Sequence, residues 1–314
     1  MVKILEERTV VKEERPWERI ERFMREGKLK QVGRIPGIIH QTWKDNNIPR
    51  KWLASPAQWK KHHPDWLHVV WTDRDIFDFI DLRHPKFSSV FRSFSYGIQK
   101  ADAIRYFILH DFGGLYSDLD LVPKRCMEEY FADGMPLYFL FSPNMNVFTN
   151  FLMASAKEEG VWREIWKRLI HPVMPSWAIG KHLEVMYSTG PAMVNDVVMN
   201  YPHPIGFLPR TVFAPIDVTG EYGMDVGGKA GVIMLPGQSW NSVDSTVLNF
   251  FYTHRYKFIT LCVLLAMFAV YVISRKIVKK VSRMSSSSSN LDLTSVEKLQ
   301  LKSPLLRKSI RGDK

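Results

Sequence analysis

The segment GIQKADAIRYFILHDFGGLYSDLDLV, residues 97–122, predicts a helix that is followed at once by a strand. Apolar residues recur in its first half with a helical period, at Ile98, Ala101, Ile104 and Ile108. Gly113 or Gly114 would end the helix. Buried strands are also predicted in IPGIIHQTW and WLHVVWT, earlier in the chain. Alternation of strands and helices predicts an α/β domain with a largely parallel sheet.

Two carboxylates lie at the end of this segment, one residue apart. If GGLYSDLDLV is one strand, Asp118 and Asp120 share a face with Tyr116, because side chains alternate along a strand. Like charges on one face repel, and a divalent cation with oxygen ligands would relieve that repulsion. Ligands gather at the carboxyl ends of strands in such sheets. We therefore expect a metal site here, although a strand end that runs into solvent would have the same sequence.

A second Asp-x-Asp, formed by Asp73 and Asp75 in WTDRDIFDFI, has a different setting. Thr72 or Asp73 has the character of a helix N-cap, and acidic residues in a first turn complement the helix dipole. We interpret this pair as structural. The Asp-x-Asp pattern is therefore weak evidence by itself.

The net charge of +11 belongs mainly to the C-terminal tail. Residues 275–314 contain eleven Lys or Arg and three acidic residues, which is +8 and leaves +3 for the rest. A nucleic-acid-binding domain is therefore not indicated. The two cysteines are Cys126, just after the acidic segment, and Cys262, inside an apolar run, and a disulfide between them is not expected.

An apolar run without a charged residue extends from Phe258 to Ser274. As a helix it would cover roughly 25 Å, close to the lower limit for a membrane span, so a bilayer anchor is predicted. A buried core helix is the alternative. Five basic residues in 275–283 would place the C-terminus in the cytoplasm. The charged N-terminus has no signal-peptide core, which conflicts with a lumenal catalytic domain.

The chain is therefore divided into four parts. Residues 1–32 are expected to form a polar, partly helical extension, and residues 33–254 a catalytic domain. Residues 255–275 would be the membrane helix. Residues 276–314 would be a basic, disordered tail, because a run of five serines opens a polar stretch there.

Asp102 and Arg105 lie three residues apart on the helix before the acidic segment, so their side chains occupy neighbouring faces. They could form a local surface ion pair worth about a few tenths of a kcal/mol. They could instead point a carboxylate and a guanidinium into the cleft, where they would hydrogen-bond sugar hydroxyls and phosphate.

Five motifs occur in a fixed order over about residues 34–250: IPGIIHQTW, HHPDWLHVVWTD, ADAIRYFILHDFGGLYSDLD, STGP and GQSW. Together they resemble the family 32 glycosyltransferases. The resemblance implies the GT-A nucleotide-diphosphosugar fold and an Asp-x-Asp pair that works with a divalent metal. An anchor soon after GQSW is most like the fungal mannosyltransferases that act on inositol phosphorylceramide.

The resemblance implies a role for each matching residue. Trp43 would stack on the nucleobase, although it could also be an ordinary core aromatic. Asp102 and Arg105 would bind the donor sugar. Asp118 would contact the ribose and the metal, and Asp120 would ligate the metal. The catalytic groups implied are Asp102, Arg105 and Trp240.

Three further residues complete the implied donor site. Asn150 would lie near the sugar, although Phe151 follows it where the family usually has an acidic residue. Ser239 and Trp240 would close over the diphosphate as a mobile loop. Related sequences often have histidine after that tryptophan, where this chain has Asn241, so metal affinity or metal choice could differ.

We therefore expect a metal-dependent, retaining hexosyltransferase that uses Mn²⁺ or Mg²⁺ and a nucleotide-sugar donor. The resemblance implies mannose from GDP-mannose, a membrane sphingolipid acceptor and a location in the Golgi or another endomembrane. One alternative is a UDP-hexose donor and another glycan acceptor. Another is a non-catalytic subunit that binds a partner enzyme, and a regulatory subunit is possible for the enzyme itself.

Overall fold

The computed structural model describes residues 14–142, 147–208, 212–214, 230–235, 244, 245, 247, 250 and 254–300. The chain divides into two units, Met1–Thr246 and Val247–Lys314. The first unit contains all of the described strands. The second contains α10 (Arg255–Gln300).

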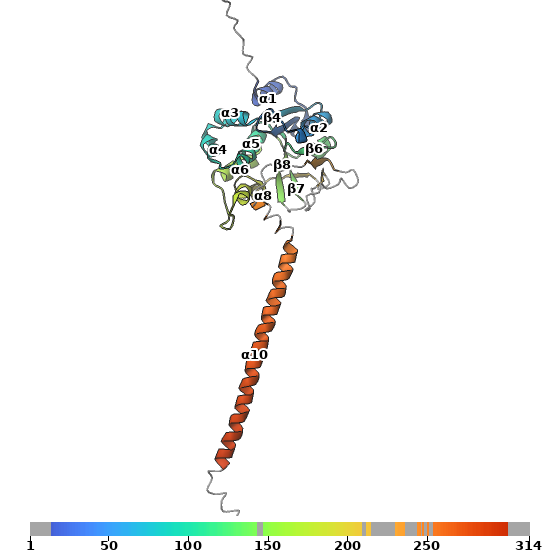
Figure 1. Cartoon of the computed structure of the whole chain (residues 1–314). Helices are drawn as coiled ribbons and strands as arrows, with labels where there is room; N and C mark the ends of the chain where they lie inside the picture. Colours follow the sequence, from blue (N-terminus) through green and yellow to red (C-terminus); the bar gives the residue numbers. More distant parts are fainter. Residues whose placement is uncertain are drawn as a thin grey trace, which may run out of the picture. The chain divides into compact units, whose positions relative to one another are not determined.

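A six-stranded sheet lies at the centre of the first unit, in the order β4-β3-β5-β8-β7-β9 (Figure 1). The neighbours β4, β3 and β5 are parallel, whereas β8 runs antiparallel to both β5 and β7, and β9 is parallel to β7. The α/β prediction is therefore confirmed. The strands are β3 (Ile38–Thr42), β4 (Leu67–Trp71), β5 (Gly114–Ser117), β7 (Leu137–Ser142), β8 (Val147–Ser155) and β9 (Gly206–Leu208).

The strands send alternate side chains into two apolar layers. Ile38 and Tyr116 belong to the core on one face, and their neighbours Ile39 and Leu115 belong to the core on the other. This period of two explains why the predicted strands are almost continuously apolar, because both faces are covered. Helices bury residues in the first layer, namely α3 (Asp73–Arg83), α4 (Ser88–Ser93), α5 (Gly97–Phe112), α6 (Val161–Ile170) and α8 (Pro191–Met199).

The second layer is closed by α2 (Ala54–His62), whose Trp59 is fully buried there. Short elements complete the described part of the first unit: α7 (Lys181–Ser188), β1 (Gln31–Val32), β2 (Ile35–Pro36), η1 (Arg50–Trp52), η2 (Pro85–Phe87) and η3 (Glu128–Phe131).

The helix α5 ends where the two glycines predicted that it would. Gly113 is its C-cap with φ of 66°, and Gly114 has φ of 96°. A Cβ atom on Gly114 would lie 2.6 Å from the carbonyl oxygen of Ile38, so a side chain there would collide with β3. The glycine pair thus lets the chain turn from α5 directly into a strand that pairs with β3.

The prediction of one continuous acidic strand is wrong. β5 ends at Ser117, and the backbone N–H of Leu121 donates to the carbonyl of Asp118 at 3.1 Å, which closes a turn. The next strand, β6 (Leu121–Pro123), belongs to a separate three-stranded sheet with β10 (Phe213–Ala214) and β11 (Val232–Met234). Asp118 and Asp120 therefore lie on the turn that joins two sheets.

The N-terminal segment contributes to the core. The helix α1 (Pro16–Arg25) buries Trp17 and Ile20 in the first layer, although its sequence is mostly charged. Trp17 packs on Trp71 of β4, with ring centroids 6.3 Å apart. Arg15 binds Asp75 of α3 at 2.9 Å. The expected polar extension thus contains a helix that is part of the folded domain.

In the second unit, the part of α10 from Arg255 to Met284 is long and apolar enough to cross a membrane, and none of it is buried (Figure 1). The helix continues to Gln300, where a disordered tail was expected from residue 276. Ile277, Val278, Val281 and Met284 continue an apolar pattern at helical spacing, which accounts for part of this extension.

A buried histidine makes the stability of the first unit depend on pH. His63, the C-cap of α2, accepts from the backbone N–H of Met127 at 2.9 Å through Nε2, and its Nδ1 lies 3.3 Å from the carbonyl of Trp59. Burial lowers the pKa of His63 to about 4. Below pH 6.5 the unfolded chain therefore binds a proton that the folded chain excludes, and the free energy of unfolding decreases.

We expect His63→Gln to be less stable than wild type at pH 7.5. The gap should shrink by about 1.4 kcal/mol per pH unit between pH 6.5 and 4, because the variant lacks this titration. Urea unfolding of both proteins across that range measures the gap. A gap that is constant with pH would contradict the assignment.

Candidate active site

The carboxyl ends of two adjacent parallel strands meet at the site. β3 ends at Thr42 and β5 at Ser117, and His40 lies opposite Tyr116 in their register. The hydroxyls of Thr42 and Tyr116 share a hydrogen bond of 3.0 Å, and Tyr116 donates to Oδ1 of Asp118 at 2.9 Å. Asp118 is therefore fixed to the end of the sheet by its own strand and by the neighbouring one.

Arg105 of α5 is buried between two carboxylates. Its Nη2 lies 2.9 Å from Oδ1 of Asp102, and its Nη1 lies 3.3 Å from Oδ1 of Asp118. The guanidinium also donates to the carbonyls of Asn150 at 2.6 Å and Ala101 at 3.2 Å, and it lies over the ring of Tyr116. With only 2% of its surface exposed, Arg105 joins α5 to the strand ends rather than facing solvent.

A hydrogen-bonded network holds Asp102 in place. Nδ2 of Asn150 donates to its Oδ1 at 3.0 Å, and the hydroxyl of Thr189 donates to its Oδ2 at 3.2 Å. Tyr106 receives a second bond from Asn150 at 2.9 Å and donates to the carbonyl of Thr189 at 2.6 Å. The structure thus brings together Asp102, Arg105, Asp118 and Asn150. These four were predicted as site residues from separate segments of the sequence.

Thr189 and Tyr106 were not predicted as site residues. Thr189 belongs to the STGP motif, for which the sequence predicts no specific role. It follows Ser188, the last residue of α7. Its neighbour Ser188 accepts from Nε2 of Gln99 at the start of α5 at 2.9 Å. The motif was visible in the sequence, but its contact with Asp102 spans 87 residues and required the fold.

Asp120 is the least satisfied of these acidic groups. Its Oδ1 is buried and has no hydrogen-bond partner among the described residues. Burial, followed by the charge of Asp118, raises the pKa of Asp120 to about 7. A buried carboxylate oxygen without a partner is costly, so the site favours a proton or a cation at this position.

We use the term carboxylate cluster for Asp102, Arg105, Asp118 and Asp120. Burial raises the pKa of Asp102 to about 7 and also raises that of Asp118, whereas Arg105 opposes both shifts. Burial lowers the pKa of Arg105, but Asp118, Tyr116 and Asp102 outweigh that effect and raise it above its ordinary value. If all three carboxylates are ionised, they and the guanidinium carry a net charge of −2, which one divalent cation would neutralise.

The residues fit a divalent cation whose coordination is completed by a bound substrate. Among the described residues, no group of three acidic, histidine or cysteine side chains could enclose a metal. Mg²⁺-type sites with substrate phosphates need only one or two carboxylates from the protein. Asp118 and Asp120, with the unpartnered Oδ1, provide that number.

Trp43 follows Thr42 directly and is half-buried. Its ring meets Trp52 edge to face at 4.9 Å, and its Nε1 donates to the carbonyl of Asn47 at 3.1 Å. Lys51 lies over the Trp52 ring at 4.3 Å, and its positive charge lowers the pKa of Asp120, against the larger effect of burial. The predicted base-stacking residue therefore lies in an aromatic and basic neighbourhood of the cluster.

The other predictions for individual residues have separate outcomes. Asp75 makes a capping box with Thr72 at the start of α3, so the structural interpretation of the second Asp-x-Asp agrees with the structure. Ser239 and Trp240 lie outside the described residues.

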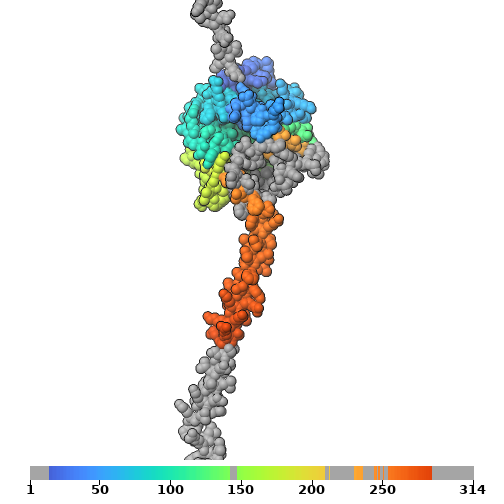
Figure 2. Space-filling view, viewed as in Figure 1, coloured from blue at the N-terminus to red at the C-terminus, as the bar shows by residue number. Residues whose placement is uncertain are grey.

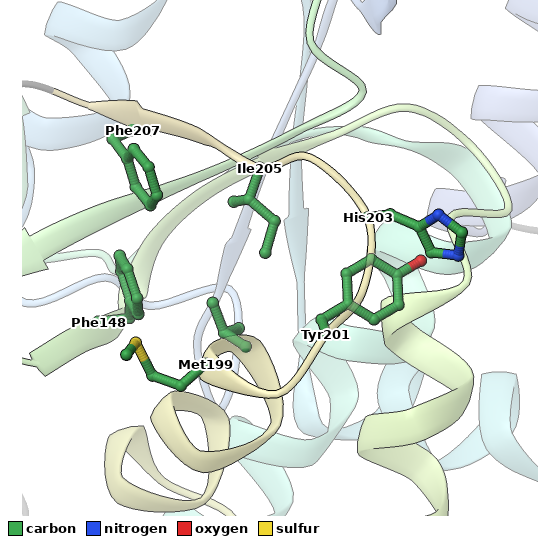
Figure 3. A pocket seen from close by; sticks show the side chains of 7 residues that line it. Phe148, Met199, Tyr201, His203, Ile205 and Phe207 are labelled. Carbon is green, nitrogen blue, oxygen red and sulfur yellow. The ribbon is translucent and has the colours of Figure 1, made fainter.

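A pocket is lined by residues outside the carboxylate cluster. Its volume is about 220 Å³, and Phe148 and Phe207 stack at one side while Tyr201 and His203 lie at the other (Figure 3). The lining contains no carboxylate and shares no residue with the cluster. We therefore place the candidate chemistry at the cluster.

Comparison with known proteins finds a match over the part of the chain that contains the cluster. Residues 49–136 match the family model described as glycosyltransferase sugar-binding region containing DXD motif, and this range includes the whole carboxylate cluster. The chain carries a DXD-type glycosyltransferase domain. The matched range leaves out Trp43 and Asn150.

Several fungal relatives are similar to the chain. Mannosyl phosphorylinositol ceramide synthase CSH1 of Saccharomyces cerevisiae is 36% identical, over 53% of this chain and 43% of that protein. Inositol phosphoceramide mannosyltransferase 3 of Schizosaccharomyces pombe is 35% identical, over 53% and 46%. Inositol phosphoceramide mannosyltransferase 1 of the same yeast is 29% identical, over 80% and 76%. The predicted resemblance is confirmed, and the chain spans less than half the length of the first two relatives.

The hydrogen bond from Thr189 to Asp102 can be tested by substitution. Thr189→Val should cost about 1–3 kcal/mol of stability, because a buried carboxylate oxygen of Asp102 loses a donor. We expect kcat/KM for sugar transfer to fall by roughly tenfold. Thr189→Ser, which keeps the hydroxyl, is the matched control and should retain most activity. Equal activity of the Val and Ser variants would contradict this role.

Proposed function

We propose that the protein is a metal-dependent, retaining hexosyltransferase that moves mannose from GDP-mannose to an inositol phosphoceramide-type membrane lipid. One observation carries the proposal. Two carboxylates, the buried Asp102 and the partly exposed Asp118, bind the buried guanidinium of Arg105 near the carboxyl ends of β3 and β5, and Asp120 keeps one oxygen without a partner among the described residues. A site with an excess negative charge suits a cation that accompanies a diphosphate.

In this proposal each acidic residue has a separate task. Asp118 and Asp120 would hold Mn²⁺ or Mg²⁺, and the cation, when bound, would supply positive charge that stabilises the departing diphosphate. Asp102 and Asn150 face the donor sugar. Arg105 positions Asp102 and Asp118, because its nitrogen atoms are already bonded to them and to backbone carbonyls.

The transfer itself forms one bond and breaks another. The oxygen of an acceptor hydroxyl bonds to the anomeric carbon while the bond between that carbon and the diphosphate breaks, and the hydroxyl proton leaves with the diphosphate. Retention follows either from attack on the same face as the leaving group, for which no protein nucleophile is required, or from two inversions through a protein nucleophile, and no such nucleophile is identified in the sequence. Trp43 is proposed to stack on the base, and Ser239 and Trp240 to close over the diphosphate.

The names of the relatives support mannose and an inositol phosphoceramide acceptor for this chain. A UDP-hexose donor is the second candidate, because stacking on Trp43 would suit either base. The purified full chain should be incubated with Mn²⁺ and GDP-mannose, UDP-galactose or UDP-glucose, with inositol phosphoceramide in vesicles. We expect glycosylated lipid to form with GDP-mannose and not with either UDP-sugar. Transfer from a UDP-sugar alone would identify the other donor, and no turnover of any donor would favour a non-catalytic subunit.

The proposed location is the Golgi or another endomembrane, with residues 258–274 as a single span. Truncation before Phe258 should release a soluble domain that still transfers to a water-soluble acceptor. Its rate on lipid in vesicles should fall strongly, because the tether raises the local acceptor concentration. Centrifugation and both assays measure this. A truncated protein that remains on membranes after an alkaline carbonate wash, or that fails to fold, would contradict the assignment of α10 as an anchor.

A further inference from the structure

The loop between α6 and α7, residues 171–180, exposes an unusual number of large apolar side chains. Ile179 is 81% exposed, Val173 62% and Trp177 61%, and Met174 and Ile170 are exposed beside them. Single exposed apolar residues need no explanation, but a group of this kind marks a surface that binds a membrane or another molecule. The segment that contains the loop lies at the surface in Figure 2, in yellow-green.

Local contacts hold these side chains in their exposed positions. The N–H of Ala178 donates to the carbonyl of Pro175 at 2.9 Å, and that of Ile179 donates to Trp177 at 2.9 Å. The ring of Trp177 packs edge to face on Tyr187 of α7 at 5.5 Å. The loop therefore presents its apolar groups in a defined shape, which reduces the entropy lost on binding.

The charges around the loop suit a lipid surface. Residues 165–183 contain no Asp or Glu, whereas two lysines, one arginine and two histidines occur there. Lys167 and Arg168 are paired with Glu164 and Asp196, but Lys181 lies over the ring of Tyr96. Tryptophan with aliphatic neighbours and flanking cations is the composition that favours the membrane interface.

Chain connectivity sets an upper limit on the distance between this loop and the start of α10. Asp244 accepts from the backbone N–H of His182 at 2.7 Å, and Ser245 is hydrogen-bonded to the His182 ring at 3.0 Å. Nine residues lie between Ser245 and Arg255, where α10 begins, and the ten Cα–Cα steps can extend at most about 35 Å. If α10 spans a bilayer, the end of this loop is tethered within that reach of the membrane surface.

We propose that residues 171–180 form a second membrane contact, in which Val173, Trp177 and Ile179 enter the interfacial region of the bilayer. The contact would also orient the site. α7 follows the loop directly, and Thr189 at its end bonds Asp102 of the carboxylate cluster. The membrane contact does not depend on which sugar or lipid the protein uses.

Fluorescence quenching in the full chain tests the contact. With Cys126→Ser and Cys262→Ala as background, Ile179→Cys or Leu82→Cys is labelled with a polarity-sensitive dye, and the protein is placed in phosphatidylcholine and phosphatidylinositol vesicles. Leu82, which is 69% exposed on α3, is the matched control. Lipids with a nitroxide near the headgroup should quench the dye at residue 179 at least roughly twofold more than at residue 82. Equal quenching would overturn the proposal and leave the loop as a surface for a protein partner.

A second variant separates this contact from the proposed transfer. Val173→Ser, Trp177→Ser and Ile179→Ser together remove only exposed apolar groups, and the melting temperature verifies that the fold is kept. We expect transfer to lipid in vesicles to fall by roughly tenfold and transfer to a soluble acceptor to remain unchanged. Equal losses on both acceptors would overturn the orienting role. If no donor is used at all, the proposed function fails while the quenching result still decides the membrane contact.

Discussion

Replacing Asp120 by asparagine is expected to lower the rate of sugar transfer by roughly 10²- to 10⁴-fold while the protein stays folded. The cation would contribute several kcal/mol of charge stabilisation to the transition state, and asparagine supplies a neutral oxygen in place of the carboxylate. Initial rates with saturating Mn²⁺ measure the loss, and chelator should abolish transfer by the wild type.

The stability of this variant has a predicted sign. Burial raises the pKa of Asp120 to about 7, so its ionised form destabilises the fold as pH rises through that value. In chelator at pH 8, Asp120→Asn should therefore be at least as stable as wild type. Below about pH 4, where Asp120 is protonated in both folded and unfolded states, this contribution disappears.

The second Asp-x-Asp provides the control. Asp73→Asn should leave transfer unchanged, because Asp73 lies in the first turn of α3 and takes no part in the cluster. Asp75→Asn should reduce stability, since Asp75 caps the helix and binds Arg15, but should also leave the chemistry intact. Full activity of Asp120→Asn would contradict the proposed site.

Replacing Arg105 by methionine is expected to cost about 3–5 kcal/mol of stability, because the buried Asp102 and the partly exposed Asp118 lose their counterion. Transfer should be lost as well. Arg92→Met is the control: its ion pair with Asp81 is exposed, and its loss should cost about 1 kcal/mol or less. Urea unfolding compares the two variants.

A double variant tests the reason for the loss. In Arg105→Met with Asp102→Asn, one of the two stranded charges is removed, so part of the lost stability should return. If Asp102→Asn gives no recovery, the role of Arg105 is packing rather than charge compensation, and the electrostatic account of the cluster is wrong.

Much of the site could be predicted because its members lie on regular elements with clear signals. The i, i+3 spacing of Asp102 and Arg105 and the glycine pair after α5 define a helix that leads straight into the acidic segment. The turn at Asp118 could not be predicted in the same way. Alternating residues fit one long strand as well as two short strands joined by a turn, and the choice depends on pairing between β6 and β11.

Other differences arise from contacts that are distant in sequence. α1 has a charged sequence, and only its neighbours β4 and α3 explain why Trp17 and Ile20 are buried. Thr189 binds Asp102 from far along the chain. Local patterns cannot contain such information, because burial is decided by the partner element.

The central claim is that Asp118 and Asp120 hold a divalent cation together with a nucleoside diphosphate. Electron paramagnetic resonance of Mn²⁺ added to the full chain tests it most directly. With the nucleoside diphosphate of the donor present, wild type and Asp73→Asn should each bind about one Mn²⁺ per chain, and Asp118→Asn and Asp120→Asn should bind far less. Equal Mn²⁺ binding by Asp120→Asn and wild type would contradict the account.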